Sequence, residues 1–241
     1  MRILLTNDDG IDAPGLRALY QAIGDLGEVH VVAPTVVQSA MSHAVTFHRP
    51  IRVVEHDDGV VRGYSVEGRP ADCVKLALGE LVDEPIDLIL SGINSGANVG
   101  INVIYSGTVA AAVEGSFHGI RSIALSLHIG DWDHKHWDRA AQHARAAIDT
   151  LLAEDIDPRV AMNVNIPILD GGREPRGVTR APMSMAPTVC RYSRTADKDG
   201  RLYQINNSLT FERIEPDTDV GALFDGQVTI TPLHFDVTHR P

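Results

Sequence analysis

The chain has 241 residues, of which 44% are hydrophobic and 22% are charged, as in an ordinary soluble globular protein with a sizeable core. Its formal net charge of −11 disfavours a stable nucleic-acid complex, because Lys and Arg drive binding to the phosphate backbone. No stretch approaches the ~18 to 20 apolar residues of a membrane span, and the N-terminus lacks the basic stretch and apolar core of a signal peptide. We therefore expect a cytoplasmic protein that binds no membrane.

The first predicted element is a buried parallel strand over residues 2–6, and Asp8 and Asp9 follow it directly. Ligands of open α/β sheets collect just beyond the carboxyl ends of such strands. Adjacent carboxylates repel one another unless a proton or a cation intervenes, so the pair indicates a hard metal ion with oxygen ligands. A polar turn without a metal is the alternative. Asp12 is expected to cap a helix that has Pro14 in its first turn.

Helical spacing of apolar residues predicts that this helix runs to Leu26 and that Gly27 ends it. Residues 28–33 predict a second strand, so the chain opens with a βαβ unit. This unit predicts an α/β protein with a Rossmann-like, mostly parallel sheet and helices on both faces. A polar, irregular loop follows over residues 35–50, and a loop of that length is usually functional or disordered.

The same alternation of elements continues to about residue 167. Further strands are predicted over residues 51–54, 60–66, 86–90, 122–127 and 160–165, and helices over residues 70–81, 108–117 and 137–153. The first two of these strands form a hairpin with its turn at residues 56–59. Beyond residue 167 the chain is rich in Gly, Pro, Arg, Ser and Thr with little periodicity, apart from one returning strand over residues 226–232. We therefore predict an α/β core over residues 1–167 and an extended C-terminal arm over residues 168–241.

A glycine-rich region joins the strand at residues 86–90 to the next helix. Asn94 and Asn98 lie among its glycines, and Ser106, Gly107 and Thr108 come immediately before or at the start of the helix. The glycines have neither the GxGxxG spacing of a dinucleotide fold nor the lysine of a P-loop. Free amides at a helix N-terminus bind phosphate together with the helix dipole, and hydroxyls add donors. Helix capping by the hydroxyls and turn formation by the asparagines are the alternatives.

Basic residues are missing from the stretches that carry these loops. Residues 3–16, 18–48 and 76–120 contain no Lys or Arg, so backbone amides and a metal must supply the positive potential if these stretches build a phosphate site. The two cysteines, Cys73 and Cys190, have the spacing of neither a disulfide framework nor a zinc ribbon, and both are expected to be buried.

Seven segments of the chain follow one another in a known order. They are TNDDGIDAPG, VVAP followed by QSA, RPADCVKLAL, SGINSGANVG, YSGTVAAAVEG, MNVNIP, and DTDV followed by VTITPL. In this order they resemble the SurE survival-protein family of metal-dependent nucleotidases, and the resemblance extends from Met1 to Leu233. The chain departs from the family pattern at a few positions, among them Arg69, which is interpreted either as a substrate contact or as a solvated residue at the start of a helix.

The resemblance implies a phosphomonoesterase that hydrolyses nucleoside 5′- and 3′-monophosphates with one divalent ion, Mg or Mn, with Ca as an alternative occupant. The implied metal ligands are Asp8, Asp9, Ser39 and Asn94, of which the two acids are also the catalytic residues. The implied phosphate contacts are Asn98, Ser106, Gly107 and Thr108. The resemblance also implies homodimers or homotetramers formed through the C-terminal arms. A phosphate or nucleotide sensor without catalysis, built on the same site, is the alternative function.

Overall fold

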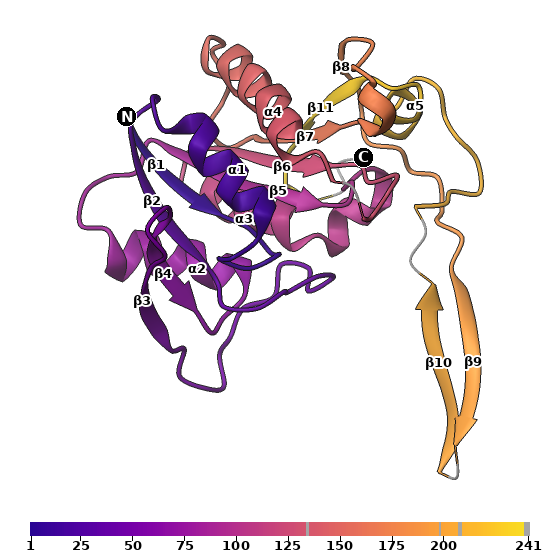
Figure 1. Cartoon of the computed structure of the whole chain (residues 1–241), viewed down its shortest axis with the longest axis horizontal. Coiled ribbons are helices and arrows are strands. Elements are labelled where there is room, and N and C mark those ends of the chain that lie inside the picture. Colours follow the sequence, from indigo (N-terminus) through magenta and orange to yellow (C-terminus); the bar gives the residue numbers. More distant parts are fainter. Residues whose placement is uncertain (134, 198, 207–208, 239–241) are drawn as a thin grey trace.

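The computed structural model of the chain describes residues 1–133, 135–197, 199–206 and 209–238. Figure 1 shows a central sheet flanked by helices, with a two-stranded hairpin that extends away from it. The sheet strands are β1 (Arg2–Thr6), β2 (Glu28–Pro34), β3 (Val53–Asp57), β4 (Arg62–Val66), β5 (Leu88–Ser95), β6 (Arg121–Leu127), β7 (Ala161–Ile166), β8 (Val178–Arg180) and β11 (Val228–Leu233); the hairpin strands are β9 (Arg191–Asp197) and β10 (Gly200–Asn206). The α-helices are α1 (Pro14–Ile23), α2 (Pro70–Leu76), α3 (Gly107–Phe117), α4 (Trp137–Leu152) and α5 (Asp219–Phe224), and shorter helical segments are η1 (Ala77–Leu81), η2 (Gly100–Tyr105) and η3 (Asp170–Gly172).

The sheet order places β1 at a reversal of the chain path. In the described part of the chain the order is β3-β4-β2-β1-β5-β6-β7-β11-β8. The chain passes from β1 outward to β2 and later returns to β5 on the other side of β1, and β1 pairs in parallel with both neighbours. A crevice forms where the path reverses in this way, outside the carboxyl ends of the strands. The predicted α/β class and mostly parallel sheet are confirmed.

Alternating side chains of the strands build a core on each face of the sheet, because successive residues of a strand point to opposite sides. Ile3 and Leu5 of β1 are fully buried in one apolar cluster together with residues of α1 and α4. Leu4, between them, is fully buried in a second cluster with residues of α2 and with Ala111 of α3. Helices therefore cover both faces, as the βαβ pattern predicts.

Three details of the sequence-based prediction for the first half of the chain are wrong. Ala13, and not Asp12, is the N-cap residue of α1, because the helix begins at Pro14 itself. The helix ends at Ile23, before Gly27, whose missing side chain admits the backbone of Met1. The hairpin turn lies two residues later than predicted, because Asp58 accepts the backbone N–H groups of Val60 and Val61 and keeps both in the turn before β4 begins.

The region after residue 167 contributes to the central sheet. The predicted returning strand is present as β11, which pairs antiparallel with β7 and in parallel with β8. The hairpin of β9 and β10 pairs over seven residues and has no counterpart among the predicted elements. The division at residue 167 into core and arm stays a prediction, and the part that stands clear of the body of the molecule is the hairpin (Figure 1). None of the described helices combines the length and apolar character needed to cross a bilayer.

The contact between α1 and the end of β5 leaves no room for a side chain at Gly15. A Cβ there would lie 2.1 Å from the carbonyl oxygen of Ile93, whereas a Cβ at Gly24, at the other end of the helix, would meet nothing closer than 3.8 Å. We expect Gly15→Ala to lower the free energy of unfolding by about 1–3 kcal/mol through overpacking. Gly24→Ala should raise it by about 0.4–1 kcal/mol, because Gly24 has a right-handed helical backbone that alanine adopts without strain. Urea unfolding of the two variants measures both effects, and equal stabilities would contradict the packing described.

Candidate active site

A cavity of about 910 Å³ opens at the carboxyl ends of the central strands. It is lined by six of the residues singled out from the sequence, which are Asp8, Asp9, Ser39, Asn94, Asn98 and Ser106. The acids follow β1, the first asparagine lies in β5 and the second follows it, and the serines belong to the loop after β2 and to the start of α3. The fold thus gathers residues from four separate segments at the point where the chain path reverses.

Asp8 is a buried carboxylate that Thr108 orients. Asp8 is 4% exposed to solvent, and the hydroxyl of Thr108 donates a hydrogen bond of 2.5 Å to its Oδ1. Burial raises the pKa of Asp8 to about 6, because the hydrogen bond from Thr108 offsets only part of the desolvation and the neighbouring charge of Asp9 adds to it. A carboxylate in this state gains from any cation placed beside it.

Asp9 is less buried and faces the cavity. The backbone N–H of Ser95 donates to its Oδ2 at 2.8 Å. Burial raises the pKa of Asp9 above its usual range, although the Ser95 hydrogen bond and the charge of Lys135 oppose the shift. Asn94, which precedes Ser95, donates its amide hydrogen to the carbonyl oxygen of Gly96 at 2.7 Å, which fixes the orientation of the amide.

The three residues at the start of α3 have distinct roles in the structure. Ser106 is the N-cap residue, and its hydroxyl accepts the N–H of Val109 at 3.1 Å, so the capping interpretation holds for it. Gly107 is in close contact with the first acid, since a Cβ there would lie 2.9 Å from the Cβ of Asp8 and 3.0 Å from its Oδ2. Thr108 uses its hydroxyl hydrogen on that acid. Phosphate binding by these residues stays a prediction.

Two buried asparagines of β7 hold the backbone of Asn98, and sequence reasoning did not assign them to the site. The Oδ1 of Asn165 accepts the N–H of Asn98 at 2.7 Å, and its Nδ2 donates to the Asn98 carbonyl at 3.0 Å. The Nδ2 of Asn163 donates to the same carbonyl at 2.8 Å. Both asparagines are fully buried. The sequence does contain a pattern that could have identified them, because two asparagines at alternate positions of an otherwise apolar strand lie on the same face of the sheet.

The loop over residues 35–50, which carries Ser39, is fixed on both sides of that residue. A backbone N–H of the loop donates to the carbonyl oxygen of Asp8 at 2.7 Å. Further along, the backbone N–H and the hydroxyl of Thr46 donate to the two carboxylate oxygens of Asp72 at 2.9 and 2.7 Å. A loop of this length usually has a function, and here its backbone is tied directly to a site acid.

A second buried carboxylate, Glu114 of α3, also anchors this loop. It pairs with His43 of the loop and with Lys75 of α2, each at 2.7 Å. Burial acts to raise the pKa of Glu114, but the hydrogen bonds from these two partners outweigh it and hold the pKa at about 2. Arg69 is the N-cap residue of α2 and its backbone N–H donates to Asp72, which places it at the start of a helix; a substrate contact stays a prediction.

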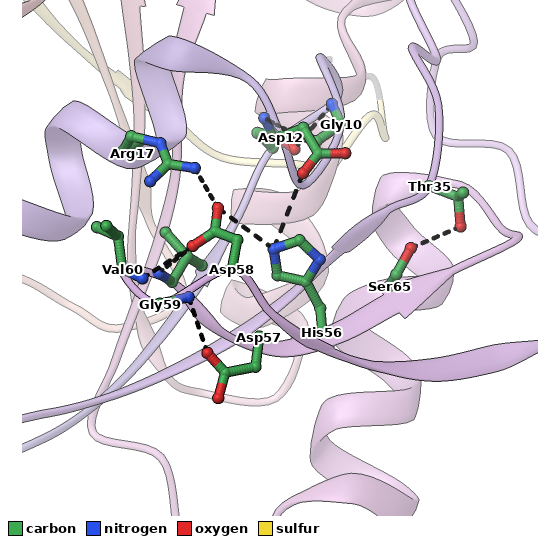
Figure 2. A network of polar contacts seen from close by, with 12 residues as sticks. Gly10, Asp12, Arg17, Thr35, His56, Asp57, Asp58, Gly59, Val60 and Ser65 are labelled. Atoms are coloured by element: carbon green, nitrogen blue, oxygen red, sulfur yellow. Dashed lines mark hydrogen bonds and ion pairs between the residues drawn. The ribbon is translucent and has the colours of Figure 1, made fainter.

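A different group of potential metal ligands lies near the hairpin of β3 and β4 (Figure 2). Among the described residues, Asp12, His56 and Asp58 present ligand atoms within 4.8 Å of one another. The imidazole Nε2 lies 3.8 and 3.7 Å from the two carboxylates. The backbone N–H groups of the turn lower the pKa of the Asp58 carboxyl, and Arg17, which donates a hydrogen bond to Asp58, lowers it further. Because this guanidinium already neutralises the group, the acids after β1 are the better cation site.

The outer part of the cavity contains residues that are distant in the sequence. Lys135 supplies a positive charge although the stretches that form the polar loops have none. Trp132, Trp137 and Tyr105 add aromatic surface to the same cavity. Cys190 also lines it and is exposed, so the expectation that both cysteines are buried is wrong for this one, although it is confirmed for Cys73.

Removing the two β7 asparagines should have unequal effects, because they satisfy different groups of Asn98. Asn165→Ala leaves the part-buried N–H of Asn98 without its acceptor, and we expect a loss of about 1–3 kcal/mol in unfolding free energy. Asn163→Ala removes one of two donors to a carbonyl and also deletes an amide oxygen that has no partner, so we expect a loss below about 1 kcal/mol. Thermal or urea unfolding compares the two, and the reverse order would exclude this assignment of roles.

Comparison with known proteins shows that the chain is similar over nearly its whole length to proteins of one family. The family model described as "Survival protein SurE" matches residues 3–194. A protein of Rhodopirellula baltica named 5′-nucleotidase SurE is 47% identical over 99% of this chain and 94% of its own length, and a protein of the same name from Syntrophobacter fumaroxidans is 42% identical over 99% and 95%. The crystal structure of the SurE protein from Aquifex aeolicus superimposes with a TM-score of 0.85 at 35% identity, covering 99% of this chain and 95% of that one.

Proposed function

The chain belongs to the SurE survival-protein family, and from that premise we propose that it is a 5′-nucleotidase, a metal-dependent phosphomonoesterase acting on nucleoside 5′- and 3′-monophosphates. The observation that carries the proposal is the pair of adjacent carboxylates, Asp8 and Asp9, at the strand reversal and beside the N-terminus of α3. Cleavage of a phosphate ester requires neutralisation of phosphoryl charge and alignment of a nucleophile, and such a site offers positions for both.

We propose that Asp8, Asp9, Ser39 and Asn94 hold one divalent ion, Mg or Mn, with Ca as an alternative occupant. All four offer oxygen atoms, which are the ligands that these hard cations take. The fit is supported by two raised carboxyl pKa values and by Gly107, because a Cβ at this position would lie 2.9 Å from the Cβ of Asp8. A bound dication neutralises phosphoryl oxygens and lowers the pKa of a water molecule.

In the proposed reaction, protein groups orient the two acids and bind the phosphoryl oxygens of the substrate. The Thr108 hydroxyl and the Ser95 N–H fix the two acids in place, and either acid can accept the proton of the attacking water. Asn98 donates one amide hydrogen to Ser126 at 2.9 Å and keeps the second for a phosphoryl oxygen. Together with Ser106, Gly107 and Thr108 at the start of α3, it forms the proposed phosphate site.

We further propose that the chain forms homodimers or homotetramers through its C-terminal arm and works in the cytoplasm. The hairpin of β9 and β10 presents several large apolar side chains with roughly half of their surface exposed. They are Tyr192, Leu202, Tyr203 and Ile205. Apolar groups on a projecting two-stranded element are more stable when a second surface covers them, because an isolated hairpin is marginally stable.

Asp9→Asn is the direct test of the metal and catalytic roles. We expect phosphate release from AMP with Mg²⁺ or Mn²⁺ to fall by about a hundredfold or more, because a neutral amide binds the cation weakly and accepts no proton. Asp12→Asn is the matched control, since Asp12 is exposed, lies outside the cavity and belongs to the other carboxylate group. Its activity should stay within about twofold of the wild type.

The same pair of variants separates the alternatives. Loss of activity in Asp12→Asn with retention in Asp9→Asn would move the metal to the group in Figure 2. Thermal stabilisation of the wild type by phosphate and metal, with no phosphate release from any nucleoside monophosphate, would favour the sensor function. EDTA should abolish activity, and activity that persists in excess chelator contradicts the metal requirement.

Metal affinity should depend on pH through Asp8. Because the pKa of Asp8 is raised to about 6, its carboxyl carries a proton below that pH and must release it before the ion binds. We expect Mn²⁺ affinity, measured by isothermal titration calorimetry, to be nearly constant above pH 7 and to fall about tenfold per pH unit below pH 6. Thr108→Val should move this onset to higher pH, since the hydroxyl of Thr108 lowers the pKa. An onset near pH 4 in the wild type would exclude a protonated buried acid.

A further inference from the structure

The charges that line the cavity do not balance once a substrate is present. Two carboxylates and one dication sum to zero, and a phosphate monoester then adds about −1.5 to −2 at neutral pH. Among the described residues that line the cavity, Lys135 is the one Lys or Arg. With the proposed metal bound, the phosphoryl group would still carry excess negative charge. The positive charge of Lys135 can offset part of it.

The position of Lys135 is set by two indole rings. Its Nζ lies 4.8 Å from the centroid of the Trp132 ring and 5.9 Å from that of Trp137. Both distances are within the range of cation–π attraction. Trp137 is the first residue of α4 and packs against the apolar cluster that contains α1, so the platform is fixed to the body of the molecule. Lys135 itself is half-buried and lines the cavity, so its ammonium is accessible to a molecule bound there.

The ammonium and the site acids line the same cavity. The charge of Lys135 acts on Asp9, which is the more accessible of the two carboxylates. Cation–π attraction to the indole rings orients the ammonium but leaves its N–H donors available. An anionic oxygen that enters the cavity offers a stronger partner, because hydrogen bonds between charged groups are about twice as strong as neutral ones.

We propose that Lys135 binds the phosphoryl oxygens of the substrate and that the two tryptophans hold its ammonium in place before the substrate arrives. This inference rests on the proposed function. It adds a substrate-binding residue to the site, and assigns the segment before α4, which the sequence patterns left without a role, to recognition of the anion.

The experiment uses the full chain with Lys135→Met, which keeps the length of the side chain and removes its charge. We expect KM for AMP and the dissociation constant of inorganic phosphate, both with Mg²⁺, to rise about tenfold, which corresponds to about 1.4 kcal/mol. Lys135→Arg keeps the charge and should stay within about threefold of the wild type. Arg62→Gln is the charge control, because the Arg62 side chain is 80% exposed on β4 and does not line the cavity.

Phosphate binding has a readout that does not depend on turnover. Trp132 and Trp137 are the two tryptophans of the chain, so its indole emission arises beneath Lys135. Phosphate that draws the ammonium off the rings should change this emission in the wild type and leave that of Lys135→Met unchanged.

The outcomes distinguish this inference from the proposed function. A wild type that neither releases phosphate from AMP nor binds phosphate contradicts the function itself. A wild type that does both, while Lys135→Met shows KM and phosphate affinity within twofold of it, overturns the role of Lys135. A rise in both constants for Lys135→Met and Arg62→Gln alike also overturns it, since the effect would then follow net charge and not position.

Discussion

Two negative charges held side by side at the end of β1 are the constraint around which the site is built. An ionised carboxylate taken out of water loses several kcal/mol of solvation unless other groups replace it. The hydrogen bonds that the described residues give to Asp8 and Asp9 come from a hydroxyl and backbone N–H groups, all of them neutral. Neutral donors orient the acids without cancelling their charge. The described hydrogen bonds therefore leave the charge of the pair uncancelled, and the divalent ion proposed above would stabilise the fold as well as assist the reaction.

Neighbouring elements approach these acids closely, and each has a residue that permits it. Gly107 lets the start of α3 approach Asp8, and Gly15 lets α1 approach the end of β5. The loop after β2 donates a backbone N–H to the carbonyl oxygen of Asp8, so its path depends on the same residue. Asp72 and Glu114 secure the far part of that loop from α2 and α3. The geometry around the acids is thus determined by several elements at once, which is how a site keeps its ligands oriented.

Local patterns in the sequence predict the parts of this structure that depend on local interactions. The apolar run of β1, the acids behind it and the small-residue helix α3 are all readable, because periodicity and turn chemistry act over a few residues. Asn163, Asn165 and Lys135 were not assigned to the site, since each acts on a partner at least thirty residues away and no local rule specifies that partner. The predicted N-cap of α1 was wrong by one residue, because Pro14 occupies the first helical position and Ala13 is therefore the N-cap residue. The hairpin of β9 and β10 was missed because its strands are largely exposed and lack a buried face.

The wall of the cavity that carries the acids and the wall beside the hairpin are built from different parts of the fold. The acid end consists of strand termini and a helix start that belong to the central sheet. The outer wall includes residues 188–190 and 209–210, which lie on either side of the projecting hairpin and are joined to each other where Val189 donates its N–H to the carbonyl oxygen of Thr210. Phe211, next along the chain, packs against Gly100 and so fixes this wall to the glycine-rich region of the site. The position of the hairpin therefore shapes the part of the cavity that residues 188–190 and 209–210 line. If chains associate through the hairpin as proposed, that contact would act on this wall, whereas Asp8 and Asp9 are held by hydrogen bonds from α3 and β5.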